Sequence, residues 1–159
     1  MKQYKNHTLQ EYLNVLAQKT PIPGGGSACA YTAGLGVALL GMVARYSQGK
    51  TSDQRVKKKI KNIINDTEKM KKRLLTLVDL DAKAHLKVTQ SRKKSPKEYR
   101  KALNTAREVP LEVCRLCYRA ITTAPFLVEK GSNYLVSDAA VACELLLASF
   151  DGALVLSKH

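Results

Sequence analysis

The sequence contains no tryptophan, and aromatic residues make up only 6% of its 159 residues. It also lacks sustained alternation of apolar and polar residues and any Asn-Gly turn, so nothing indicates a β-sheet. Four cysteines are too few for a secreted disulfide framework of this length, and the first ten residues contain no apolar signal-peptide core. These absences predict a helical protein of the reducing cytoplasm.

Acidic residues are scarce, 13 against 27 lysines and arginines, which gives a net charge of +14. The imbalance lies in the middle of the chain, because residues 50–107 hold 19 basic and six acidic residues. A polyanion such as a nucleic acid is therefore one candidate partner. It is the less favoured one, since the basic run has no interleaved aromatics and no known reading motif, and a solvated helix face explains it more simply.

The longest apolar run, residues 28–44, is built mainly from alanine and glycine and is interrupted by Thr32. A spanning helix requires about 20 strongly apolar residues, so we expect no membrane span. Because the run is apolar on every side, its helix should be central and covered all round, by a bundle or partly by a second subunit.

Apolar periodicity and capping residues predict about five main helices. The predicted N-caps are, in chain order, Thr8, Ser27, Ser52 or Asp53, Ser95, and Ser137 or Asp138. Pro110 should kink or break the fourth helix, and Gly131 should be a C-terminal helix stop. No repeat or linker divides the chain. The sequence therefore predicts one all-α domain over residues 1–159, a helical bundle with one central apolar helix.

The stripe of the third predicted helix, from Val56 to Val88, is apolar or threonine at every position except Asp81. Burying an unpaired carboxylate is costly or raises its pKa, so Asp81 should have a partner or a chemical role. Asp79 lies two residues earlier and His85 one turn later, which suggests an acid–base cluster on one helix. The alternative is structural: Asp81 caps a neighbouring helix or pairs with a buried lysine or arginine.

The run Gly24-Gly25-Gly26-Ser27 is the second candidate site. Glycines let a backbone approach a ligand closely, and the free N–H groups at the start of the next helix favour an anion or a carbonyl oxygen. No lysine follows the glycines and no strand precedes them, so a nucleotide-binding loop is not indicated. A flexible turn is the simpler interpretation of three glycines alone.

Metal chemistry is not indicated by the cysteines. Cys114 and Cys117 are three residues apart, but no second pair of ligands accompanies them and no strand precedes them. We expect two core thiols and no metal.

Four ordered segments carry a resemblance to a known family. They are Thr20-Pro21-Ile22-Pro23-Gly24-Gly25-Gly26-Ser27, Asp79-Leu80-Asp81-Ala82-Lys83-Ala84, Glu108-Val109-Pro110-Leu111-Glu112 and Val136-Ser137-Asp138-Ala139-Ala140-Val141-Ala142. Together, over residues 9–156, they resemble the cyclodeaminase/cyclohydrolase family of folate enzymes, found also as the second half of formiminotransferase-cyclodeaminase.

The resemblance implies an all-helical homodimer with a folate site in a cleft near the subunit interface, and no cofactor besides the tetrahydrofolate substrate. The reaction it implies is either cyclisation of 5-formiminotetrahydrofolate with loss of ammonia or interconversion of methenyl- and 10-formyltetrahydrofolate. Asp81 or Asp79 would be the acid or base, assisted by His85. The implied substrate-binding residues are Gly24, Gly25, Gly26, Ser27, Ser137 and Asp138.

Two features depart from the family pattern. His85 stands where the family usually has an aromatic residue, and the chain stops at His159, before the family's usual final helix. No formiminotransferase segment precedes the match, so we do not expect two coupled reactions. The alternative function is a folate-binding or structural helical dimer without turnover. For the leading function, the lysine-rich middle suggests a polyglutamylated folate, because a basic surface attracts its chain of carboxylates.

Overall fold

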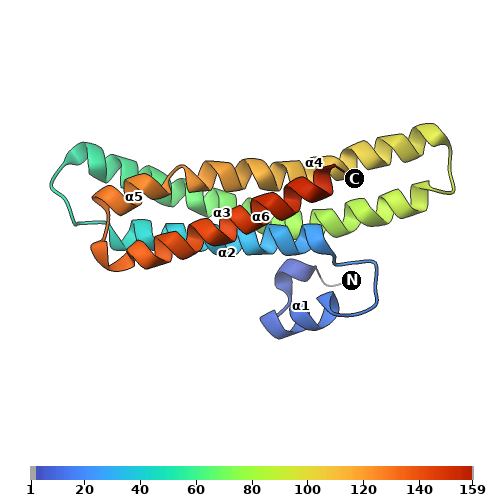
Figure 1. Cartoon of the computed structure of the whole chain (residues 1–159), viewed down its shortest axis with the longest axis horizontal. Helices are drawn as coiled ribbons and strands as arrows, with labels where there is room; N and C mark the ends of the chain where they lie inside the picture. Colours follow the sequence, from blue (N-terminus) through green and yellow to red (C-terminus); the bar gives the residue numbers. More distant parts are fainter. Residues whose placement is uncertain (1–2, 159) are drawn as a thin grey trace.

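The computed structural model describes residues 3–158, which form six α-helices, two short 3-10 helices and no strand. The elements are η1 (Tyr4–Asn6), α1 (Leu9–Leu16), α2 (Gly25–Tyr46), α3 (Gln54–Ser91), α4 (Pro96–Ile121), α5 (Ala124–Lys130), η2 (Asn133–Leu135) and α6 (Val136–Ser157). The long helices α2, α3, α4 and α6 run alongside one another, and η1 and α1 lie against one side of this bundle, next to the start of α2 (Figure 1). The predicted all-α bundle is confirmed.

Three of the predicted helix starts are confirmed. The Thr8 side chain accepts a hydrogen bond from the Glu11 N–H, and the Glu11 carboxylate accepts one from the Thr8 N–H, which forms a capping box for α1. Asp53 caps α3, and the Ser95 hydroxyl accepts the Glu98 N–H at the start of α4.

Two of the predicted starts are wrong. Helix α2 begins at Gly25 with Gly24 as its N-cap, so Ser27 lies in the first turn instead of capping it. Helix α6 follows Leu135 directly and has no side-chain cap, so Ser137 and Asp138 also lie in a first turn. The reason is that η2 leads straight into α6, while an extended glycine backbone precedes α2.

Pro110 does not break α4, which runs without interruption from Pro96 to Ile121. A break that the sequence analysis did not foresee follows at Thr122 and Thr123. There the threonine hydroxyls donate to backbone carbonyls of the last helical turn and α4 gives way to α5. Gly131 lies at the end of α5, as predicted.

Helix α2 lies in the core and packs against α3, α6 and α4. Glycine, alanine and serine make up most of its buried side, beside Val37, Leu40 and Val43, and these small residues let the neighbouring helices come close. At Gly36 an added Cβ would lie 2.7 Å from Leu146 Cγ and 3.0 Å from the Ala142 carbonyl oxygen of α6. The glycines and alanines of the apolar run therefore allow close packing between α2 and α6.

Helices α2 and α6 nevertheless keep an exposed apolar face. Leu35 on α2 and Val141 and Val155 on α6 are 45%, 52% and 56% exposed. Within one chain, α2 is thus not covered all round, so the bundle alone does not supply the expected cover and a second subunit stays a prediction. By length and composition alone, α2 and the segment Asn133–Ser157 are apolar enough to cross a bilayer, a criterion that core helices also meet.

Candidate active site

Asp81 continues the buried stripe of α3 and faces the first turn of α2. Its Oδ2 accepts a hydrogen bond from the Ser27 backbone N–H at 2.9 Å. An unpaired N–H at a helix start is a favourable partner for a carboxylate, because the helix dipole adds to the attraction. The alternative interpretation of Asp81, a cap on a neighbouring helix, therefore describes one of its contacts correctly. The same carboxylate also lines a cavity.

Gly26 is the residue that lets the carboxylate reach the α2 backbone. A Cβ built on Gly26 would lie 2.0 Å from Asp81 Oδ1 and 2.5 Å from Asp81 Cγ. A Cβ on Gly25 would meet only the Leu156 side chain, at 3.6 Å, and one on Gly24 would meet nothing within 4 Å. Of the three predicted glycines, Gly26 alone is required by the packing of Asp81.

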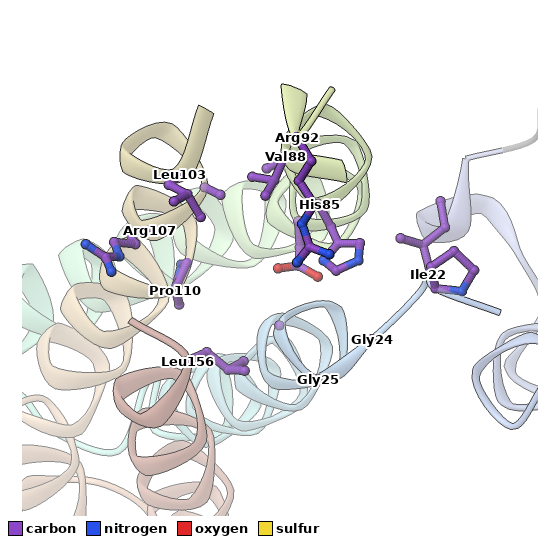
Figure 2. A pocket seen from close by; sticks show the side chains of 15 residues that line it. Ile22, Gly24, Gly25, His85, Val88, Arg92, Leu103, Arg107, Pro110 and Leu156 are labelled. Carbon is purple, nitrogen blue, oxygen red and sulfur yellow. The ribbon is translucent and has the colours of Figure 1, made fainter. Parts of the chain in front are cut away.

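The cavity has a volume of about 440 Å³ and lies between α3, α4 and the loop that precedes α2. From α3 it is lined by Asp81, Ala84, His85, Val88 and Arg92, and from α4 by Leu103, Ala106, Arg107 and Pro110. Figure 2 shows the α3 side chains on one side of the cavity, those of α4 across from them, and Leu156 of α6 near the glycine turn. Asp81, His85 and the three glycines, all predicted site residues, come together here.

Burial raises the pKa of the Asp81 carboxyl above its ordinary value, while the Ser27 N–H and His85 act in the opposite direction. Desolvation disfavours the charged carboxylate, so its proton is held to higher pH than in water. A carboxyl group of this kind can accept and return a proton within one reaction cycle. His85, one helical turn further on, is exposed on the cavity side.

A buried contact behind Ser27 supports this geometry. The Tyr12 hydroxyl and the Ser27 hydroxyl lie 3.0 Å apart, and the Tyr12 ring stacks on Tyr31 with centroids 5.0 Å apart. Burial raises the pKa of the Tyr12 phenol, which therefore stays neutral. Helix α1 is thereby fixed to the first turn of α2, at the residue whose N–H binds Asp81.

Asp79 faces a different part of the molecule. It is buried, and its Oδ1 accepts the Tyr4 N–H of the N-terminal segment at 2.7 Å. Its Oδ2 has no hydrogen-bond partner among residues 3–158. Asp79 lines a separate cavity of about 110 Å³, together with Tyr4 and Ile22. Residues two apart on a helix point to different faces, so Asp79 and Asp81 do not form the compact cluster that the sequence analysis expected.

Ser137 and Asp138 are not brought to the cavity of their own chain. They lie in the first turn of α6, whereas Leu156, which lines the cavity, lies in its last turn. At 1.5 Å per residue, the helix places the two ends about 28 Å apart. Figure 1 shows the first turn of α6 at one end of the bundle and its last turn beside the start of α2. Their predicted substrate-binding role has no support from the geometry within one chain.

Ten of the fifteen cavity residues were not singled out as site residues from the sequence, among them Arg92, Arg107, Pro110 and Leu156. Arg92 follows Asp81 by eleven residues, three turns on the same helical face, so periodicity offered a signal for it. Arg107 and Pro110 reach the cavity only because α4 packs beside α3, and Leu156 reaches it because α6 packs beside α2 and α4. No local pattern indicates that arrangement.

The cysteines belong to the core, as predicted. Cys114 and Cys117 are buried, and burial raises the pKa of the Cys117 thiol to about 12. A thiol with such a pKa stays protonated and is a poor metal ligand or nucleophile. Within residues 3–158, no group of three or more histidine, cysteine or acidic side chains is placed to hold a metal ion.

Comparison with known proteins places the chain in a family. The model of the family described as formiminotransferase-cyclodeaminase matches residues 8–158. The chain belongs to the formiminotransferase-cyclodeaminase family. The resemblance inferred from the four sequence motifs is thereby confirmed.

Individual members of this family are similar over most of the chain. Methenyltetrahydrofolate cyclohydrolase of Methylorubrum extorquens is 32% identical over 147 residues, 86% of this chain and 71% of that protein. Formimidoyltransferase-cyclodeaminase of Gallus gallus is 27% identical over 91% of this chain, which matches 29% of that longer protein. The crystal structure of formiminotetrahydrofolate cyclodeaminase from Thermotoga maritima has a TM-score of 0.91 at 29% identity, and the match covers 95% of this chain and 76% of that one.

Proposed function

We propose that this protein is a folate one-carbon enzyme that acts at the N5–N10 bridge of tetrahydrofolate, as a methenyltetrahydrofolate cyclohydrolase or a formiminotetrahydrofolate cyclodeaminase. A relative with the first name is 32% identical in sequence, and a solved structure with the second name has the same fold. The observation that carries the proposal is the Asp81 carboxyl, which has a raised pKa and stands between the α2 backbone and a cavity of about 440 Å³.

Both reactions require one group that takes up a proton and returns it. In the cyclohydrolase reaction, water adds to the methenyl carbon and loses a proton. The bond from this carbon to N5 then breaks as the remaining hydroxyl loses its proton and becomes the formyl oxygen. N5 receives one of the two protons lost by the water, so one proton is released overall. In the cyclodeaminase reaction, N10 adds to the formimino carbon and loses its proton, and the nitrogen that leaves as ammonia is protonated. We assign these transfers to Asp81, because burial tunes its pKa for exchange closer to neutral pH.

The test is turnover of the two substrates by the purified protein. Decay of the methenyltetrahydrofolate absorbance reports cyclohydrolase activity, and ammonia release from 5-formiminotetrahydrofolate reports cyclodeaminase activity. We expect one of the two rates to exceed the buffer rate, and Asp81→Asn to lower kcat by about 10²- to 10⁴-fold, the usual contribution of a general acid or base. Asp79→Asn is the matched control and should keep kcat within about threefold of the wild type, because Asp79 does not line the main cavity.

Two results would contradict the enzymatic proposal. The first is a wild-type protein that is no faster than buffer with either substrate, and the second is an Asp81→Asn variant with unchanged kcat. Binding of a folate without turnover would instead favour the second candidate function, a folate-binding module.

We further propose that the folate substrate is polyglutamylated. The end of α3 and the start of α4 project beyond the C-terminal end of α6 (Figure 1). In this hairpin, residues 87–101 hold seven basic residues and one acidic residue. A chain of carboxylates is attracted to such a surface, and salt weakens the attraction. We expect a lower KM for a tri- or pentaglutamate than for the monoglutamate at low salt; equal KM values there would contradict this proposal.

We also propose that the protein forms a homodimer. The exposed apolar face of α2 and α6, which includes Leu35, Val141 and Val155, supports it, because a contact between two copies would remove these side chains from water. Light scattering on the eluting protein should give twice the chain mass, and Leu35→Glu should shift it toward the mass of one chain. A wild-type mass of one chain at micromolar concentration would argue against a dimer.

A further inference from the structure

The cavity changes character along α3. Asp81, His85, Val88 and Arg92 occupy one helical face at steps of four, three and four residues. The carboxylate and the guanidinium belong to residues whose backbone positions are about 16 Å apart, because a helix rises 1.5 Å per residue. The wall between them is mostly apolar and includes Val88 and, on α4, Leu103. The α3 side of the site thus runs from an acidic end at Asp81, past His85 and Val88, to a basic end at Arg92, and Arg107 of α4 lies across the cavity.

A tetrahydrofolate has the same order of chemical groups. Its polar pterin and one-carbon bridge are followed by an uncharged aminobenzoyl ring and then by a glutamate with two carboxylates. Standard bond lengths place the first glutamate carboxylate about 10 Å from N10. An extended arginine side chain spans about 6 Å and leans toward the N-terminus of its helix, here toward Asp81. The guanidinium of Arg92 therefore reaches the level at which this carboxylate lies when the bridge is at Asp81.

Arg92 also differs from Arg73 and Arg45, two arginines paired with glutamates on other helices, in lacking an acidic partner within the described chain. Arg73 is paired with Glu112 at 2.6 Å and Arg45 with Glu68 at 2.7 Å. Among residues 3–158, no acidic side chain forms an ion pair with Arg92, although it lines the cavity. Figure 2 shows Arg92 on the same side of the cavity as His85. Its guanidinium donors are available to an anionic ligand.

We infer that Arg92 binds the α-carboxylate of the first glutamate of the folate substrate and thereby sets the one-carbon bridge at Asp81. The inference rests on the proposed function and adds the direction in which the substrate lies in the cavity. A planar guanidinium forms two parallel hydrogen bonds to a carboxylate, which fixes orientation as well as position. Because this contact is far from the reacting atoms and is made equally before and during the reaction, Arg92 is a specificity residue that acts on binding and not on kcat.

The test compares two ligands that differ only in the glutamate. Dissociation constants of 5-formyltetrahydrofolate and of 5-formyltetrahydropteroate, which lacks the glutamate, are measured by calorimetry for the wild type and for Arg92→Ala. We expect Arg92→Ala to weaken binding of the folate by about 10- to 100-fold, the range for hydrogen bonds to charged groups, and to leave binding of the pteroate unchanged. Arg92→Lys keeps the positive charge but lacks the paired N–H donors of the guanidinium, so its loss of folate affinity should be intermediate.

Arg55→Ala is the matched control, because Arg55 is an exposed arginine in the first turn of the same helix and does not line the cavity. It removes the same charge and should bind both ligands as the wild type does. Arg92 is itself exposed, so its replacement should leave the circular dichroism spectrum and Tm unchanged. Equal losses for both ligands, or no loss for the folate, would overturn the assignment.

The result is separable from the fate of the proposed function. If the wild type bound the folate more tightly than the pteroate through Arg92 but turned over neither substrate, the enzymatic proposal would fail and the assignment of Arg92 would stand. If turnover were observed and Arg92→Ala left both KM and the two dissociation constants unchanged, the enzymatic proposal would stand and the assignment of Arg92 would fail.

Discussion

Two carboxylates stand two residues apart on α3, and they lie in opposite surroundings. Asp81 faces the first turn of α2 and a cavity that contains His85 and Arg92. Asp79 faces the N-terminal segment, accepts the Tyr4 N–H and leaves its second oxygen without a hydrogen-bond partner in the described chain. Each accepts one backbone N–H. The comparison teaches that the segment packed against a helix decides the role of an aspartate. Asp81 is available to a ligand, whereas Asp79 holds the N-terminal segment by a hydrogen bond.

The substitution Gly26→Ala should have the largest effect on the Asp81 side of this comparison. The new Cβ would occupy space within 2.0 Å of Asp81 Oδ1, so the carboxylate has to move away from the Ser27 N–H. We expect kcat to fall by about 100-fold or more, because a misplaced acid or base loses most of its effect. Steady-state kinetics would measure this.

Gly34→Ala is the control for Gly26→Ala, because Gly34 lies on the same helix as Gly26. A Cβ at Gly34 would meet only Leu74 Cβ of α3, at 4.0 Å. Its kcat should match that of the wild type. If both alanine variants had wild-type kcat, the close contact between Gly26 and Asp81 would have no catalytic meaning.

Replacing the other carboxylate, by Asp79→Ala, should affect stability and not catalysis. It leaves the buried Tyr4 N–H without its acceptor, a loss of about 1–3 kcal/mol in the free energy of unfolding. Urea denaturation measures this loss, and the kcat of the folded variant should stay close to that of the wild type. A kcat loss as large as that of Asp81→Asn would remove the distinction between the two aspartates.

The smallest expected effect is the pH dependence of stability at Asp81. Its folded-state pKa is raised, so the folded protein binds the proton more tightly than the unfolded chain does. The group therefore contributes stability below its unfolded pKa of about 3.9, and this contribution is lost as pH rises through the folded-state pKa. Asp81→Asn removes the cost of the buried charge, so its Tm should exceed that of the wild type at neutral pH.

The difference in Tm between Asp81→Asn and the wild type should shrink as pH falls toward 4. Calorimetric scans across this range would measure it. A difference that grows on acidification would mean that Asp81 is stabilised as the anion, contrary to the raised pKa.

The fold could be predicted from local signals, whereas the site could be predicted only in part. The capping of α1, α3 and α4 and the stripe of α3 depend on neighbours in sequence, and these predictions are confirmed. Asp81 stood out because a charge interrupted an apolar stripe. Asp79 was grouped with it on sequence proximity alone, although residues two apart on a helix diverge.

The remaining site residues depend on packing between helices. Ser137 and Asp138 resemble a family motif, but the motif carries no information on distance, and α6 places its first turn at the end of the bundle opposite Leu156. Arg107 and Leu156 also owe their position to helix packing. Helices α4 and α6 run antiparallel, and this arrangement places both residues at the cavity. The apolar periodicity of a helix predicts which of its faces is buried, but not which other helix packs against that face.

Leu156 belongs to the last turn of α6 and faces Gly25 across the cavity wall. One side of the ligand chamber is therefore closed by α6, a helix that carries none of the groups to which proton transfer or carboxylate binding is assigned. Leu156→Ala would leave Asp81, Gly26 and Arg92 in place, yet the chamber would open to water on that side.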